Sequence, residues 1–134
     1  MPIRGVNHIT LCVSDLDRAL GFYRDVLGAR VKAGGPSAAY LELGHLWLCL
    51  ECADLVQPGS DDSHIALDCT QDDFEALSTR IRAAADIWKE NRSEGASIYF
   101  RDPDGHKLEL HVGTLQDRLD HYATRTDAPL KVRT

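Results

Sequence analysis

The stretch HITLCVS at residues 8–14 decides the fold, because HIALDCT at residues 64–70 repeats it without a gap. Both copies begin with His and Ile, have Leu at the fourth position and end on a hydroxyl residue, Ser14 or Thr70. An acidic residue follows each hydroxyl residue three positions later, which approximates a capping box. We therefore predict that Ser14 and Thr70 each cap a helix and that a strand precedes each of them.

The same order of elements follows both copies. Apolar residues recur at helical spacing after each cap, and Gly28 ends the first such segment. Three short strand-like runs come next: RVKAG, AAYLELGH and LWLCLE in the first half, IWKENR, SIYFRDPDG and HKLELHV in the second. The sequence thus predicts an α+β fold of two tandem βαβββ units, about 7–52 and 64–112, forming a cupped mixed sheet. We expect a single domain over 1–134, with a third helix at about 114–125.

The composition is typical of a globular protein and argues against several partners. The 134 residues carry a net charge of −6, which disfavours nucleic acid or an anionic membrane as a partner. No apolar run approaches the roughly 18–20 residues that span a bilayer, and the first residues lack a signal-peptide pattern. We expect a cytoplasmic protein without disulfides, in which Cys12, Cys49 and Cys69 are core residues.

Three side chains of the repeat form a candidate metal site. Glu109 lies between two leucines in the strand after the turn DPDG (102–105), where a solvent-facing glutamate is the simple interpretation. A lone histidine at a strand start is likewise more often scaffolding than a ligand. His8 and His64, however, occupy the same position in the two copies, and a pseudo-two-fold axis would bring equivalent positions face to face. Two imidazoles and one carboxylate are a common ligand set for a divalent metal with open positions.

From residue 4 to about residue 120, the chain resembles the vicinal-oxygen-chelate superfamily, whose paired βαβββ units hold a metal. Within it, four stretches resemble the FosA-type fosfomycin-resistance glutathione transferases: NHITL, AAYLELGHLWLCL, WKENRSEGASIYFRDPDGHKLELHVG and LQDRL. The long KENRSEGASIYF match is more specific than the DPDG-x-x-x-E ending that the superfamily shares. This resemblance implies that glutathione is added to the epoxide ring of fosfomycin, a small phosphonate.

The resemblance also implies roles for individual residues. His8, His64 and Glu109 are implied to bind Mn(II), with His8 supplied across a swapped homodimer interface. No protein nucleophile is needed, because the glutathione thiolate attacks the epoxide carbon. The candidate catalytic residues are Thr10, which would hydrogen-bond the oxygen as it becomes an alkoxide, and Tyr40.

A second group of residues is implied to bind the substrate and a second cation. The substrate-binding candidates are Lys89, Arg92, Ser93, Tyr99, Arg118 and Trp47. Tyr40 and Trp47 would line the pocket, although aromatic strand residues could equally be core. The loop NRSEGAS is implied to wrap a potassium ion through oxygens of Asn91, Ser93, Gly95 and Ser97. Because Ser97 lies outside the His-His-Glu set, replacing it is expected to leave Mn(II) binding nearly unchanged. The alternative is an ordinary hairpin loop whose serines bond their own backbone.

Other functions stay open on the sequence alone. A related hydrolase would activate water and need a carboxylate base, for which Glu42 and Glu51 are the nearby candidates. A relative that uses bacillithiol or cysteine would keep the same metal site, and a drug-sequestering binding protein would need no metal. The family often has an aromatic residue and a glutamine where this chain has GGPS (34–37), and Glu51 also departs from its pattern. We therefore expect glutathione to be preferred but weakly bound.

Overall fold

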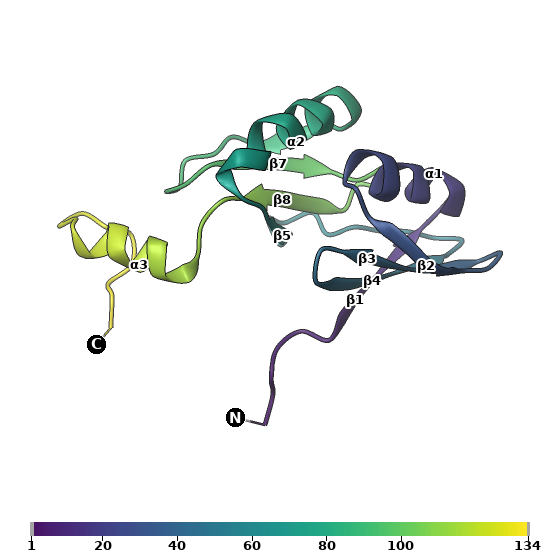
Figure 1. Cartoon of the computed structure of the whole chain (residues 1–134), viewed down its shortest axis with the longest axis horizontal. Helices are drawn as coiled ribbons and strands as arrows, with labels where there is room; N and C mark the ends of the chain where they lie inside the picture. Colours follow the sequence, from purple (N-terminus) through teal and green to yellow (C-terminus); the bar gives the residue numbers. More distant parts are fainter. Residues whose placement is uncertain (1, 134) are drawn as a thin grey trace.

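The computed structural model describes residues 2–133. Its elements form two units of the same order, each a strand, a helical segment and three further strands (Figure 1). The elements of the first unit are β1 (His8–Val13), α1 (Leu16–Leu20), the π-helical turn η1 (Gly21–Val26), β2 (Arg30–Gly34), β3 (Ala38–Leu43) and β4 (Leu46–Cys52). Those of the second are β5 (Ile65–Asp68), α2 (Gln71–Ala84), β6 (Ile87–Lys89), β7 (Ser97–Arg101) and β8 (Lys107–His111), followed by the C-terminal helix α3 (Leu115–Ala123).

Each unit makes one four-stranded mixed sheet. The strand order is β1-β4-β3-β2 in the first sheet and β5-β8-β7-β6 in the second. The first strand of each unit pairs in parallel with the last, and the other pairs are antiparallel. The predicted α+β class with two βαβββ units is therefore confirmed, whereas a single domain over the whole chain stays a prediction. Both β1 and β5 lie at the edge of their own sheet.

The two helix starts differ from each other. Thr70 caps α2 as predicted, since its side chain accepts a hydrogen bond from the Asp73 backbone N–H at 3.3 Å. The prediction for Ser14 is wrong, because Asp15 caps α1 through the Arg18 N–H. The Ser14 hydroxyl instead donates to Asp104 Oδ1 at 2.6 Å, in the distant DPDG turn. Ser14 thus hydrogen-bonds a partner ninety positions away in the chain instead of capping α1.

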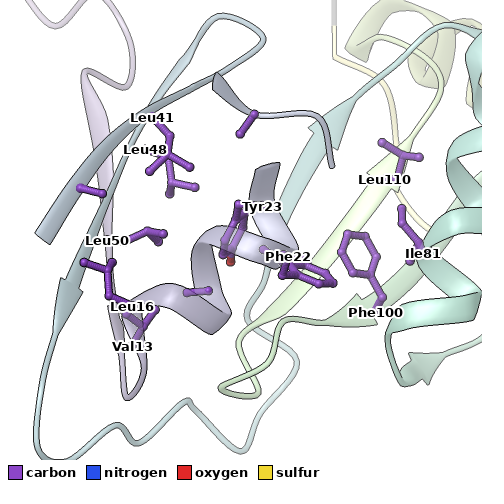
Figure 2. Close-up of a cluster of buried hydrophobic side chains, with 14 of the residues drawn as sticks. Val13, Leu16, Phe22, Tyr23, Leu41, Leu48, Leu50, Ile81, Phe100 and Leu110 are labelled. Carbon is purple, nitrogen blue, oxygen red and sulfur yellow. The ribbon is translucent and has the colours of Figure 1, made fainter. Parts of the chain in front are cut away.

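One hydrophobic core joins the two units. Figure 2 shows Phe22 of η1 beside Phe100 of β7, and their ring centroids lie 6.2 Å apart. α2 covers one face of the second sheet, while α3 lies apart from both sheets (Figure 1). Of the cysteines predicted in the core, Cys49 is buried and Cys69 is half-buried, but the prediction for Cys12 is wrong. Cys12 is exposed because strand alternation places it opposite the apolar residues of β1.

None of the helices in the described part of the chain has the length and apolar character needed to cross a membrane.

Candidate metal centre

Glu109 does not face solvent. Its neighbours Leu108 and Leu110 are buried in the core, so strand alternation turns the Glu109 side chain to the opposite face of the second sheet. The residue is nevertheless only 7% exposed. A carboxylate this deeply buried needs hydrogen-bond or ionic partners for both oxygens, because an unpartnered buried charge is costly.

The first oxygen of Glu109 contacts His64. His64 Nε2 lies 2.9 Å from Glu109 Oε1, and His64 Nδ1 lies 2.7 Å from the backbone oxygen of Asp62. A carbonyl oxygen only accepts, so the partner assigns the imidazole proton to Nδ1. In a neutral imidazole, Nε2 then presents a lone pair to a carboxylate oxygen, which also only accepts. Two acceptors in contact require a shared cation or proton, and this donor set fits a divalent metal.

The second oxygen of Glu109 accepts from Ser97. Ser97 Oγ lies 2.6 Å from Glu109 Oε2 and 2.5 Å from His111 Nδ1. The hydroxyl therefore contacts a candidate metal ligand directly. We expected that replacing Ser97 would leave Mn(II) binding unchanged, because Ser97 was treated as separate from the His-His-Glu set. The contact with Glu109 removes the basis of that expectation.

Polar and aromatic side chains continue across the same face of the second sheet. Tyr99 pairs with Glu109 on one side and with Lys89 on the other, so all three point the same way. Tyr99 is 6% exposed, and Lys89 Nζ lies 5.4 Å from the centroid of its ring. Trp88 and Tyr99 each approach the His64 ring edge-on, with centroids 5.3 and 5.8 Å away. The candidate ligand His64 is therefore walled by aromatic rings.

Arg118 reaches this region from α3. Its Nε donates to Glu94 Oε2 at 3.1 Å, and its Nη2 donates to the Glu94 backbone oxygen at 3.2 Å. Burial lowers the pKa of the Arg118 guanidinium, but hydrogen bonds with Glu94 and Tyr122 outweigh this effect and hold the pKa above its ordinary value. Arg118 is therefore a fixed cation beside the loop 91–97.

The loop NRSEGAS is closed by its own side chains. Asn91 Oδ1 accepts from the Ser93 backbone N–H and hydroxyl, and Asn91 Nδ2 donates to the Gly95 oxygen at 2.8 Å. Gly95 has φ +84°, and a Cβ placed there would lie 2.6 Å from the Val112 backbone oxygen. Only glycine fits this approach to the end of β8. Arg92, in the same loop, is exposed.

The remaining predicted residues lie on the first sheet. His8 pairs with Trp47 in the register, and their ring centroids are 4.4 Å apart. Tyr40 packs edge-on against Trp47 at 5.5 Å, and the two are 49% and 38% exposed, so neither is a core residue. Thr10 shares the exposed face of β1 with His8. His8 Nδ1 contacts Asn7 Oδ1 at 2.7 Å, which leaves its Nε2 pointed away from that partner.

The chain by itself does not bring all three predicted ligands together. Within residues 2–133, no group of three His, Cys, Asp or Glu side chains is placed to hold a metal ion. His64 and Glu109 meet on the second sheet, whereas His8 lies on the first, and β1 and β5 are not hydrogen-bonded to each other. The predicted ligands thus form two half-sites on separate sheets, His64 with Glu109 on the second sheet and His8 on the first.

Comparison with known proteins places this architecture in a family. Residues 5–110 match the sequence profile of the Glyoxalase/Bleomycin resistance protein/Dioxygenase superfamily. The chain belongs to that superfamily. The two βαβββ units and the contact between His64 and Glu109 are therefore features of a member of this superfamily.

Relatives of this chain include thiol transferases and a fosfomycin resistance protein. The chain is 49% identical over 122 residues to a glutathione transferase FosA of Serratia marcescens, covering 87% of this chain and 86% of that protein. It is 38% identical over 130 residues to a metallothiol transferase FosB of Lysinibacillus sphaericus, covering 91% and 92%. A FosX structure from Listeria monocytogenes, complexed with Mn(II) and sulfate, superposes with a TM-score of 0.80 at 33% identity over 90% of this chain and 98% of that one. The predicted resemblance to FosA-type proteins is confirmed.

Sequence reasoning missed two residues that shape this superfamily site. They are Asp62, whose carbonyl orients His64, and His111, which contacts Ser97. The alternation of Lys107, Glu109 and His111 along β8 did carry a signal for His111, since it shares a face with Glu109. Asp62 lies in a loop, where no periodicity indicates which group points to the site.

Proposed function

We propose that this protein is a Mn(II)-dependent transferase that inactivates fosfomycin by adding the thiol of glutathione to its epoxide. The observation that carries the proposal is the contact between His64 Nε2 and Glu109 Oε1, which lie 2.9 Å apart while other partners hold both side chains in place. The 49% identity to a glutathione transferase FosA supports the choice of thiol, and the likeness to the fosfomycin resistance protein FosX supports the choice of substrate.

The metal is bound by His64 and Glu109 of one copy and by His8 of a second copy. The FosX complex with Mn(II) supports the choice of metal, and imidazole and carboxylate ligands suit it. When bound, the ion supplies a Lewis acid for the negative charge that develops on the epoxide oxygen. The Asp62 carbonyl orients His64, and the Ser97 hydroxyl orients Glu109. These hydrogen bonds fix which lone pairs the two ligands present to the metal.

The phosphonate is bound by the polar face of the second sheet and the adjoining loop. Lys89 and Arg118 supply positive charge, and Tyr99 supplies a hydroxyl beside Lys89. Charge-assisted hydrogen bonds to an anion are the stronger kind, and Arg118 is already oriented by Glu94 before substrate arrives. The loop adds two further groups, the hydroxyl of the half-buried Ser93 and the guanidinium of the exposed Arg92.

The reaction needs a hydrogen-bond donor rather than a protein nucleophile. The glutathione thiolate attacks an epoxide carbon, the carbon–oxygen bond breaks, and the oxygen keeps the electron pair and then takes a proton. Thr10 donates a hydrogen bond to that oxygen from the same face of β1 as His8. Tyr40 and Trp47 form the aromatic wall on this side, and Tyr40 offers a second hydroxyl.

The protein acts as a homodimer, because each chain presents two incomplete half-sites. Edge strands β1 and β5 carry unpaired backbone groups, which natural proteins cover or pair. In a two-fold dimer the first sheet of one copy faces the second sheet of the other, so each site combines His8 from one chain with His64 and Glu109 from its partner. The exposed Trp47 and Tyr40 are covered in the same step.

A potassium ion in the loop 91–97 is the second cation of the proposal. A phosphonate beside one divalent metal keeps uncompensated negative charge, and a nearby cation lowers the cost of holding it in a partly desolvated pocket. The loop offers the oxygens of Asn91, Ser93, Gly95 and Ser97 within a tight turn.

The thiol and the compartment belong to the same proposal. Glutathione is the expected thiol, bound weakly because GGPS (34–37) and Glu51 depart from the family pattern. The cytoplasm, where glutathione keeps thiols reduced, is the expected location, and the four cysteines are free.

A hydrolase is the second candidate function. The structure of a FosX mutant at 34% identity is complexed with Mn(II) and 1S,2S-dihydroxypropylphosphonic acid, a diol of the kind that water addition to an epoxide gives. Product analysis of the Mn(II)-loaded protein separates the two functions. We expect a thioether adduct that forms only with thiol, and glutathione should give a higher rate than cysteine or bacillithiol. A diol formed at full rate without thiol would assign the protein as a hydrolase.

Mixing two inactive variants tests the shared site. His8→Ala and His64→Ala homodimers are each expected to be inactive, because every site lacks one ligand. After subunit exchange at equal concentrations, about half of the dimers are mixed, and each has one complete site, so about one quarter of wild-type activity should return. Mixing His64→Ala with Glu109→Gln is the matched control, since both changes fall on the same half-site and no complete site can form. A fully active monomer in sedimentation would refute the shared site.

A further inference from the structure

We propose that His111 is a positioning residue for the metal ligand Glu109. The inference rests on the proposed function, because it concerns how the candidate metal centre is held. His111 acts on the Glu109 carboxylate through Ser97 and through its own Nδ1, 3.5 Å from Glu109 Oε2, and its other ring nitrogen faces Arg118. One imidazole would thereby connect the metal ligand to the cation that binds the phosphonate.

The hydrogen bonds around His111 run in one direction. A metal-binding carboxylate only accepts, so the single Ser97 hydroxyl proton points to Glu109 Oε2, 2.6 Å away. Ser97 Oγ must then accept from its other neighbour, His111 Nδ1 at 2.5 Å, which places the imidazole proton on Nδ1. His111 Nε2 is left as an acceptor, and Arg118 Nη2 approaches it at 3.5 Å.

Burial and packing hold this arrangement still. Ser97 and Glu109 are 9% and 7% exposed, so water competes little for their hydrogen bonds. Two glycines, Gly95 and Gly113, lie beside the His111 ring. A Cβ at Gly95 would lie 2.9 Å from Cε1, and one at Gly113 would lie 3.3 Å from Nε2. A side chain at either position would therefore crowd the ring, and the two glycines leave the room that it occupies.

The two ring nitrogens of His111 have different partners, Ser97 for Nδ1 and Arg118 for Nε2, so substitutions can remove the two contacts separately. His111→Asn keeps an N–H near the position of Nδ1 for Ser97 but has no acceptor that reaches Arg118. His111→Gln places a carbonyl oxygen near the position of Nε2 for Arg118 but removes the short donor to Ser97. His111→Leu removes both. A residue that only fills space would show no such division.

The test measures Mn(II) binding and kinetics for all three variants. Free Mn(II) is quantified by electron paramagnetic resonance during titration of each metal-free protein. We expect His111→Leu and His111→Gln to bind Mn(II) about 10–100-fold more weakly than wild type, and His111→Asn to recover most of that affinity. In Mn(II)-saturated protein, His111→Asn should raise the KM for fosfomycin while largely keeping kcat, because Arg118 loses a partner.

The outcomes separate this inference from the proposed function. A wild-type protein that neither binds Mn(II) nor forms the thiol adduct overturns the proposed function and this inference with it. A wild type that does both, with all His111 variants binding Mn(II) equally, overturns the inference alone. Circular dichroism melting checks that each variant is folded. Should His111→Leu not fold, the inference requires His111→Asn to bind Mn(II) more tightly than His111→Gln, and the opposite order refutes it.

Discussion

Replacing Gly95 by alanine should destabilise the protein for two reasons that the structure lets us separate. Gly95 has φ +84°, a conformation that costs an L-residue about 1–2 kcal/mol. A Cβ at this position would also lie 2.6 Å from the Val112 backbone oxygen and 2.9 Å from His111 Cε1. The backbone oxygen cannot rotate away, so the loop must separate from the end of β8.

Gly28 provides a matched control for this change. It has φ +81°, almost the same value, yet nothing lies within 4 Å of a Cβ built on it. Gly28→Ala should therefore cost only the backbone term of about 1–2 kcal/mol. Gly95→Ala should cost about 1–3 kcal/mol more, which is the usual range for overpacking.

Urea denaturation of both variants measures the difference in the free energy of unfolding. Gly95→Ala should in addition raise the KM for fosfomycin, because the displaced loop carries Glu94 and its ion pair with Arg118. Gly28→Ala should leave that KM unchanged. Equal losses of stability in the two variants would refute the close approach of the loop to β8.

Three further predictions follow from the site and the core. His64→Ala and Glu109→Gln should each abolish turnover and lower Mn(II) content by elemental analysis without unfolding the protein, and normal metal content in both would refute the proposed centre. KCl should raise turnover above NaCl at constant ionic strength, because we propose that oxygens of the loop 91–97 bind K⁺, and identical rates would favour an ordinary hairpin loop. Burial, then the nearby Asp102 carboxylate, raises the pKa of Tyr23 far above its ordinary value of 10.0. Above about pH 10 the unfolded chain loses this proton and the folded protein keeps it, so stability relative to Tyr23→Phe should fall by about 1.4 kcal/mol per pH unit in urea unfolding, and a constant difference from pH 7 to 11 would contradict this.

The local pattern of the sequence determined the elements and their order. Short strand-like runs predicted β4, β7 and β8, the repeated segment predicted β1, and helical spacing with the Thr70 cap predicted α2. These signals lie within a few residues of one another, so the chain carries them without its tertiary contacts. The repeat of the two histidines also indicated which strand positions are equivalent. It could not indicate how far apart the two sheets lie in space.

The tertiary structure decided the contacts between distant groups. Asp15 caps α1 in place of the predicted Ser14, because the Ser14 hydroxyl donates to Asp104, ninety positions away. Ser97 was expected to act apart from the ligands, yet the pairing of β7 with β8 brings its hydroxyl to Glu109.

The separation of His8 from the other two predicted ligands has the same origin. His64 meets Glu109 because β5 and β8 are neighbours in one sheet, while His8 belongs to the other. Alternation fixes the face of a strand on which a side chain lies, whereas packing of the strands and sheets fixes what that side chain meets. A hydrogen bond or a metal ligand set depends on distances of about 3 Å, and those are fixed only when the sheets are assembled.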